Sequence, residues 1–210
     1  DKAVGYHETT GYPKKIAHSG YAKTPANKNS SLQIQQRLLE GVKNNNTVPR
    51  VALQSTNPEV LSNIKRKNMS IVNADKMNSK DIEIELIYPL PGTTYDGWVK
   101  ELSGMMPIKK LKINVYPCLI LPNAELNDKS YKKRFKMKTK TIPFNVDMEE
   151  CEIITSMESM SYEDVVKGWM FVWIVKNFWF EPILRYIYYE YFKADVKIKD
   201  FFVKFQDFLE

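Results

Sequence analysis

The residues of this chain that could bind a small molecule begin directly after a short apolar run, 51–53. Gln54 and Ser55 follow that run, and eleven residues separate Gln54 from Arg66. A glutamine amide donates and accepts hydrogen bonds at once, which suits a ribose or an amide. An arginine guanidinium forms bidentate pairs with carboxylates and phosphates. The spacing therefore indicates a strand that ends in polar residues, followed by a helix that carries Arg66 at its end.

A carboxylate follows in the segment 81–90, where apolar and acidic residues alternate. This alternation predicts a strand with one buried face and one polar face, and Glu85 lies on the polar face. Inside a barrel lumen such a carboxylate could bind two hydroxyl groups. Because Glu83 lies on the same face, the pair could equally mark a sheet face that is exposed to solvent.

Gln54 and Arg66 also have interpretations that need no ligand. Gln54 could cap backbone groups where its strand ends. Arg66 stands between Lys65 and Lys67, a pattern typical of a solvated helix C-terminus that the helix dipole favours. Taken singly, each residue is better explained in this way, so the choice depends on the elements that position them.

Those elements alternate between strands and helices. Pro58 follows a capping Asn57 at the first helical position, and Thr93 or Thr94 caps the next helix. Strand–helix alternation predicts right-handed crossovers, a parallel sheet and a ligand site at the carboxyl ends of its strands. The expected strands are 15–22, 50–55, 81–90 and 110–121, and the expected helices are 30–42, 58–66 and 94–102.

The pattern changes after Leu121. Seven of the twelve residues from Lys129 to Lys140 are basic, and we interpret 127–147 as a connecting loop. A solvated surface is favoured there over contact with RNA. The region 148–210 is rich in aromatic residues, and Ser161 with Asp164 forms a capping box. We expect its helices at 162–180, 182–192 and 198–210.

Composition bounds the class of protein. The 210 residues are 43% hydrophobic with a net charge of +6, which permits a compact fold and an anionic ligand without requiring one. Cys118 and Cys151 are too far apart for a local metal site, and the two histidines are also distant from each other. The longest apolar stretch is shorter than a membrane span. We expect a cytoplasmic protein with no membrane partner.

Three motifs, in this order, resemble the radical S-adenosylmethionine enzymes, and most of all their cobalamin-binding type. The first is Gln54-Ser55, five residues, Leu61, four residues, Arg66. The second is "ELIYPLPG" from Glu85 to Gly92, and the third is "LPNAELNDKSY" at 121–131. The resemblance implies an α/β fold, namely the C-terminal part of a partial (β/α)6 TIM-like barrel with about four parallel strands and crossover helices. A C-terminal helical region would follow it.

The resemblance also implies roles and domains. Gln54, Ser55 and Arg66 would bind S-adenosylmethionine through its ribose or amino-acid end, and Glu85 would contact the ribose. The Leu90–Gly92 turn would lie near the adenine. No catalytic residue and no metal ligand of this chain are implied. The domains would be a partial barrel at 1–126, the basic loop at 127–147 and the helical region at 148–210.

The chain departs from the family pattern in several places. It has no C-x₃-C-x₂-C motif to hold a 4Fe–4S cluster, and Pro89 and Thr93 replace the family's Gly and Glu. We therefore expect the C-terminal portion of an enzyme of radical alkyl or methyl transfer or rearrangement, inactive alone. A missing N-terminal half or a partner chain would supply the cluster and any cobalamin for a small-molecule or peptide substrate. The alternatives are a degenerate domain that binds a ligand or partner without catalysis, and an accessory protein that binds RNA through its basic loop.

Overall fold

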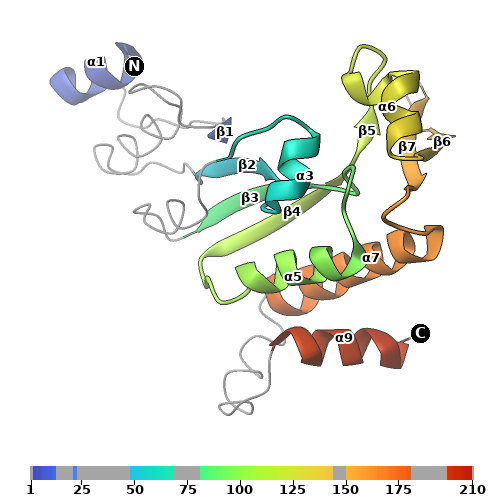
Figure 1. The fold of residues 1–210 in the computed structure, drawn as a ribbon. Helices are drawn as coiled ribbons and strands as arrows, with labels where there is room; N and C mark the ends of the chain where they lie inside the picture. The colour runs from blue at the N-terminus through green and yellow to red at the C-terminus, as the bar shows by residue number, and fades with distance from the viewer. Residues whose placement is uncertain are drawn as a thin grey trace. The chain divides into compact units, whose positions relative to one another are not determined.

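A computed structural model describes residues 2–12, 21–22, 48–68, 81–143, 150–180 and 198–209 (Figure 1). The chain divides into two compact units. The first unit comprises Asp1–Thr56, Lys67–Leu86 and Ile108–Asn114, and the second comprises Asn57–Arg66, Ile87–Pro107 and Val115–Glu210. The predicted helices 30–42 and 182–192 and most of the predicted strand 15–22 lie outside the described residues. A helix that the sequence did not predict, α1, spans Lys2–Thr10.

A four-stranded sheet runs through the first unit, in the order β1-β2-β3-β4. β1 pairs with β2 and β2 pairs with β3 in parallel, so three of the strands form the predicted parallel arrangement. The strand order follows the chain order. The mixed α/β class is confirmed, and closure into a barrel stays a prediction. The strands are β1 (Tyr21–Ala22), β2 (Arg50–Gln54), β3 (Ile82–Tyr88) and β4 (Leu111–Pro117).

Alternation places the apolar side chains of this sheet on one face. Val51, Ile84 and Leu86 are fully buried, and Val51 is the register partner of Ile84. The other face is half-buried, and there Arg50 Nε lies 2.5 Å from Glu83 Oε2 across the parallel pair. Burial of β-branched and leucine side chains on one side explains why the alternating pattern in the sequence predicted β3 correctly.

Helices of the second unit begin where the sequence predicts. Asn57 accepts a hydrogen bond from Glu59 N, and Thr94 accepts one from Gly97 N. Ser161 and Asp164 form the reciprocal capping box. These caps satisfy backbone N–H groups that would otherwise lack partners. The helices are α3 (Pro58–Asn63), α5 (Tyr95–Met105), α7 (Tyr162–Val175) with its π-helical extension η2 (Lys176–Phe180), and α9 (Ile198–Leu209).

A small antiparallel sheet in the second unit differs from the prediction. The expected strand 110–121 ends at Pro117, and the residues after Cys118 form β5 in a second sheet with the order β5-β7-β6. The interpretation of 127–147 as a loop was wrong for its helix and its strand, and 148–210 contains a strand as well as helices. The new elements are β5 (Leu119–Ile120), η1 (Glu125–Asn127), α6 (Lys129–Arg134), β6 (Lys138–Ile142) and β7 (Cys151–Ser156).

Two of the basic residues pair with acids on β7 and in the turn after it. Lys132 Nζ lies 2.9 and 2.8 Å from the two carboxylate oxygens of Glu152, and Thr139 on β6 donates to the same carboxylate. Lys136 pairs with Glu158. These acids stand 20 or more residues from their lysines, so the basic run looked solvated when it was considered by itself.

Tyr88 is the centre of the packing in the second unit. Its ring is fully buried, stacks on Trp98 with centroids 4.6 Å apart, and meets Trp169 edge-on at 5.4 Å. Its hydroxyl lies 3.2 Å from the carbonyl oxygen of Asp164 and 3.3 Å from that of Val165. Burial raises the pKa of this phenol well above its usual value, with the Asp164 carboxylate adding to the effect.

Gln206 joins three helices that lie side by side (Figure 1). The Tyr95 hydroxyl on α5 donates to Gln206 Oε1, and Gln206 Nε2 donates to the carbonyl oxygen of Lys167 on α7, both at 3.0 Å. This amide is 1% exposed, so its hydrogen bonds replace those with water. None of the described helices is long and apolar enough to cross a bilayer.

We expect Gly168→Ala to destabilise the protein. A Cβ at Gly168 would stand 1.9 Å from Tyr88 Oη, so the added methyl forces the phenol or α7 to move. Overpacking of this kind costs about 1–3 kcal/mol. Gly104→Ala is the matched control, because Gly104 is an exposed glycine of α5 with nothing within 4 Å of its Cβ position. That substitution should stabilise the helix by about 0.5–1 kcal/mol. Urea unfolding checks both, and equal effects of the two variants would contradict the packing at Tyr88.

Acid should weaken the second unit through Glu152. Hydrogen bonds from Lys132 and Thr139 hold the pKa of Glu152 below its ordinary value of 4.5. A lowered pKa in the folded state gives stability that is present above about pH 4.5 and is lost as the pH falls through the lowered pKa. Glu152→Gln should therefore lower the urea midpoint at neutral pH and flatten its decline towards about pH 3. Glu158→Gln, which breaks an exposed pair, is the control and should leave that decline in place.

Candidate functional site

Gln54 has an unusual backbone conformation at the carboxyl end of β2. Its φ is 61°, in the left-handed region that residues other than glycine seldom adopt. Ser55 N donates to the carbonyl oxygen of Leu53 at 2.8 Å, which closes a tight three-residue turn around Gln54. The register with β3 also shifts between Ala52 and Gln54. Strained residues of this kind persist where the surrounding structure holds them, often at ligand sites.

Asn68 holds this turn in place. Its Nδ2 donates to the carbonyl oxygen of Leu53 and, at 2.6 Å, to that of Ser55. The capping role considered for Gln54 is therefore performed by Asn68, which the sequence did not single out because an asparagine after a basic run carries no distinctive signal. Within the described part of the chain, the half-buried Gln54 amide makes no hydrogen bond.

Two other predicted residues belong to the same unit. Ser55 is 2% exposed and follows Gln54 directly. Glu85 is half-buried on β3, where its register partner is Ala52. Glu85 thus lies within β3, and Gln54 and Ser55 lie at and directly after the carboxyl end of the adjacent parallel strand β2. This is the edge of a parallel sheet at which ligands generally bind.

Arg66 does not lie on a helix, contrary to the prediction. α3 ends at Asn63, Lys65 has a φ of 51°, and Arg66 follows it. Lys65 N donates to Ser62 O at 3.1 Å and Arg66 N donates to Leu61 O at 2.8 Å, a pair of bonds that ends helices as a Schellman motif. The side chain is half-buried, and burial lowers the pKa of its guanidinium. Arg66 belongs to the second unit, so its convergence with Gln54 stays a prediction.

Leu90 and Gly92 form a turn of the second unit. Thr93 N donates to Leu90 O at 2.9 Å, and Thr93 Oγ1 accepts from Leu90 N at 3.2 Å. Gly92 has a φ of 89°, which the third position of a Pro-Gly turn requires. Asn63 Nδ2 donates to Pro91 O at 3.1 Å and leaves no room for a side chain at Gly92. Leu90 is 4% exposed, so these motif residues have a structural role, and their contact with an adenine stays a prediction.

The two cysteines lie at separate places in the second unit. Cys118 is buried, and burial raises the pKa of its thiol to about 12, which opposes the thiolate that binds metals. Cys151 is half-buried, and both thiols are free. Among the described residues, no group of three or more His, Cys, Asp or Glu side chains could hold a metal ion.

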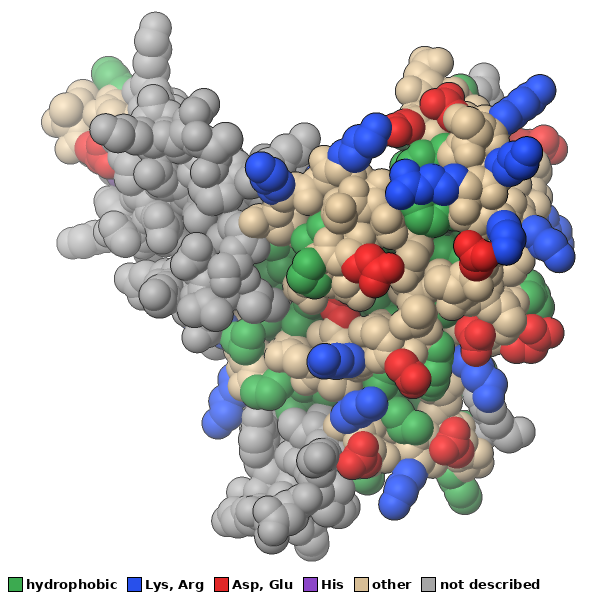
Figure 2. Space-filling model, in the orientation of Figure 1, with side chains coloured by type: hydrophobic (Ala, Val, Ile, Leu, Met, Phe, Trp, Pro, Cys, Tyr) green, Lys and Arg blue, Asp and Glu red, His purple; other side chains and the backbone are tan. Residues whose placement is uncertain are grey.

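The basic residues of α6 and β6 do not make a uniformly cationic surface. Lys132 and Lys136 form ion pairs with Glu152 and Glu158. Figure 2 shows Lys and Arg side chains mixed with carboxylates over this part of the second unit. Paired cations release few counterions on binding a polyanion, so this arrangement favours the solvated-surface interpretation over RNA binding.

Comparison with known proteins gives little further information. No protein-family model matches the chain, and no curated protein matches it. Among solved structures, archaeal Elp3 of Methanocaldococcus infernus with an N-terminal deletion (1–46) matches at 23% sequence identity and a TM-score of 0.37. The match covers 50% of this chain and 25% of that chain, so this chain corresponds to only a quarter of that protein's length.

We expect Lys65→Gly to stabilise the second unit. Left-handed backbone costs a residue with a side chain about 1 kcal/mol relative to glycine. Lys65→Ala is the matched control, because it also removes the exposed ion pair between Lys65 and Glu125 and retains the strained φ. Exposed pairs contribute about 0–1 kcal/mol, so Lys65→Ala should be neutral or slightly destabilising. Urea unfolding distinguishes the two, and a Lys65→Gly variant no more stable than Lys65→Ala would contradict the Schellman assignment.

Proposed function

We propose that this chain is part of a radical S-adenosylmethionine enzyme and that Gln54, Ser55 and Glu85 bind the nucleoside of S-adenosylmethionine. The order and spacing of the three sequence motifs support the proposal. The observation that carries it is the conformation of Gln54, a strained residue at the carboxyl end of a parallel strand with a half-buried amide that has no partner within the described residues.

The chemistry of these side chains suits a nucleoside. The Gln54 amide can donate to one ribose hydroxyl and accept from another, and the Glu85 carboxylate can accept from both. Arg66 is a candidate for the carboxylate at the amino-acid end, because a partly desolvated guanidinium forms stronger pairs with anions than a solvated one. Leu90 and Gly92 would contribute the turn near the adenine.

A 4Fe–4S cluster does not fit the residues of this chain. Such clusters are held by several thiolates, and this sequence has two cysteines, of which Cys118 is buried with a raised pKa. We place the cluster, and cobalamin where the enzyme uses it, on a segment or partner outside this sequence. The reaction would be a radical alkyl or methyl transfer or a rearrangement. The chain by itself should bind the nucleoside and catalyse nothing.

The misfit of the cluster also favours a second candidate, a degenerate domain that binds the nucleoside without radical chemistry. Both candidates use the same binding residues, and they differ in whether a cluster-binding segment accompanies those residues. A C-x₃-C-x₂-C segment encoded in frame upstream would support the enzyme, whereas a start codon directly before Asp1 would support the degenerate domain.

Substitution of Gln54 tests the nucleoside site. Gln54→Ala and Gln54→Gly both remove the amide, and we expect each to weaken binding roughly tenfold, the worth of one or two hydrogen bonds. Gln54→Gly should also raise stability by about 1 kcal/mol because it relieves the left-handed strain. Titration calorimetry with S-adenosylhomocysteine and with 5′-methylthioadenosine, which lacks the amino-acid end, measures the affinities.

Lys65→Gly is the control for this experiment. It relieves the same kind of strain at a residue outside the proposed site, so it should raise stability and leave both affinities unchanged. Binding of 5′-methylthioadenosine that is undetectable, or that survives both Gln54 substitutions at full strength, would refute the nucleoside site.

A further inference from the structure

A small cavity lies between η1 and α6 in the second unit. Its volume is about 200 Å³, and it is lined by Glu125, Asp128, Ser130, Tyr131 and Arg134. Pockets for drug-sized ligands measure roughly 300–1,000 Å³, so this one admits only a small molecule. None of its residues belongs to the proposed nucleoside site.

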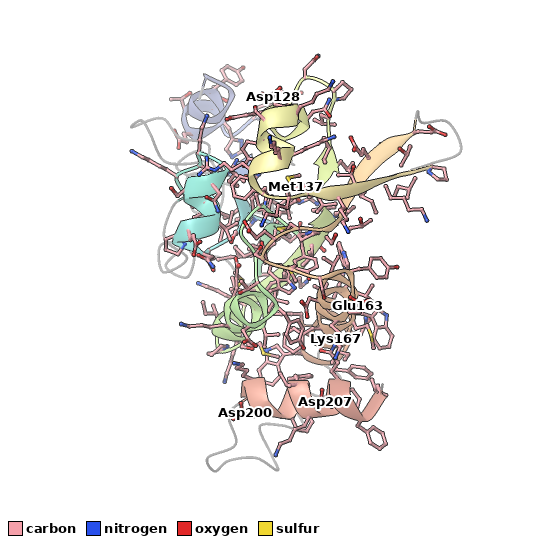
Figure 3. The ribbon with its side chains drawn as sticks, turned by 45° about the vertical axis from the view of Figure 1, so that its right-hand side comes forward. Asp128, Met137, Glu163, Lys167, Asp200 and Asp207 are labelled. Carbon is pink, nitrogen blue, oxygen red and sulfur yellow. The ribbon has the colours of Figure 1, made fainter. Side chains whose placement is uncertain are left out.

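The frame of this cavity is well anchored. Tyr131 is 7% exposed, its hydroxyl donates to Asn63 O at 2.9 Å, and its ring lies 4.9 Å from that of Phe135. At the other end of α6, Met137 N donates to Lys132 O at 2.9 Å and closes the helix. Figure 3 shows Asp128 at the start of α6 and Met137 beyond its end. A frame fixed at both ends can hold charged side chains ready for a ligand.

The charges that line the cavity are of opposite sign and are not all paired. Glu125 already has a partner, because its Oε1 lies 2.5 Å from Lys65 Nζ. Within the described part of the chain, Asp128 and Arg134 form no ion pair with each other or with any other residue. The Arg134 guanidinium lies over the Phe135 ring, 5.0 Å from its centroid. Asp128 and Arg134 therefore line the same small cavity, and neither forms an ion pair within the described part of the chain.

We propose that this cavity binds a small zwitterion of the α-amino-acid type. Its ammonium group would pair with Asp128 and its carboxylate with Arg134, with the Ser130 hydroxyl as a further hydrogen-bond donor. A ligand with only one charge would meet a residue of the same sign at the other end of the cavity. The arrangement thus selects for both charges on one small molecule.

Three matched ligands test the charge requirement on the 210-residue chain. L-Alanine carries both charges, L-alaninamide only the cation and N-acetyl-L-alanine only the anion. We expect L-alanine to bind at least roughly tenfold more tightly than either derivative. Chemical-shift changes at the Ser130 and Tyr131 amides report binding at this cavity. Equal binding of the three, or no shifts at these amides, would overturn the proposal.

Three variants then assign each charge to its residue. Asp128→Asn should weaken the binding of L-alanine and L-alaninamide without affecting that of N-acetyl-L-alanine. Arg134→Gln should weaken the binding of L-alanine and N-acetyl-L-alanine without affecting that of L-alaninamide. Lys133→Gln is the control, an exposed cation of the same helix that does not line the cavity. Asp128 makes no capping hydrogen bond with its side chain, so its substitution should leave α6 folded. If Lys133→Gln lowers the affinity for L-alanine as much as Arg134→Gln does, the effect comes from net charge alone and the site is refuted.

Discussion

The second unit depends on the contact between Tyr88 and α7. The tyrosine ends β3 and precedes the Leu90–Thr93 turn, and its ring stacks on Trp98 in α5. Its hydroxyl reaches backbone carbonyls of α7 only because Gly168 has no side chain. One aromatic side chain thereby connects a strand, a turn and two helices. The buried hydroxyl retains hydrogen-bond partners, which burial of a phenol requires.

Three residues other than glycine have a positive φ, and they differ in what explains them. Lys65 and Lys136 each come shortly after a short helix, and in both cases the backbone N–H of the lysine and that of the next residue complete a Schellman motif. Helix termination is therefore a sufficient explanation for these two lysines. Gln54 is the last residue of strand β2, and Asn68 satisfies the neighbouring carbonyls. Its conformation belongs to the turn between Leu53 and Ser55 and not to the end of a helix, and its half-buried amide has no partner among the described residues, which is why it carries the proposed site.

Local patterns in the sequence predicted local structure well. Asn57, Thr94 and Ser161 each cap a helix within three residues, so their neighbours alone determine them. Features that depend on distant residues were not predictable. The part-buried pair of Lys132 with Glu152 joins the basic run to a strand that follows it by 20 residues, and the importance of Gly168 depends on a tyrosine eighty residues earlier. Of the candidate site, the sequence indicated Gln54 and Glu85 by type and position but could not show that Asn68 leaves the Gln54 amide available.

A polar group without a partner is not by itself evidence for a ligand. Trp98 Nε1 is also buried without a hydrogen bond among the described residues, yet the Trp98 side chain is only 1% exposed and its ring stacks on that of Tyr88. Its missing bond is a cost of aromatic packing. Gln54 differs because it is half-buried and strained, and Asp128 and Arg134 differ because they line a cavity with opposite charges. Access to a ligand, combined with a missing partner, is what distinguishes a binding group from an imperfection of the core.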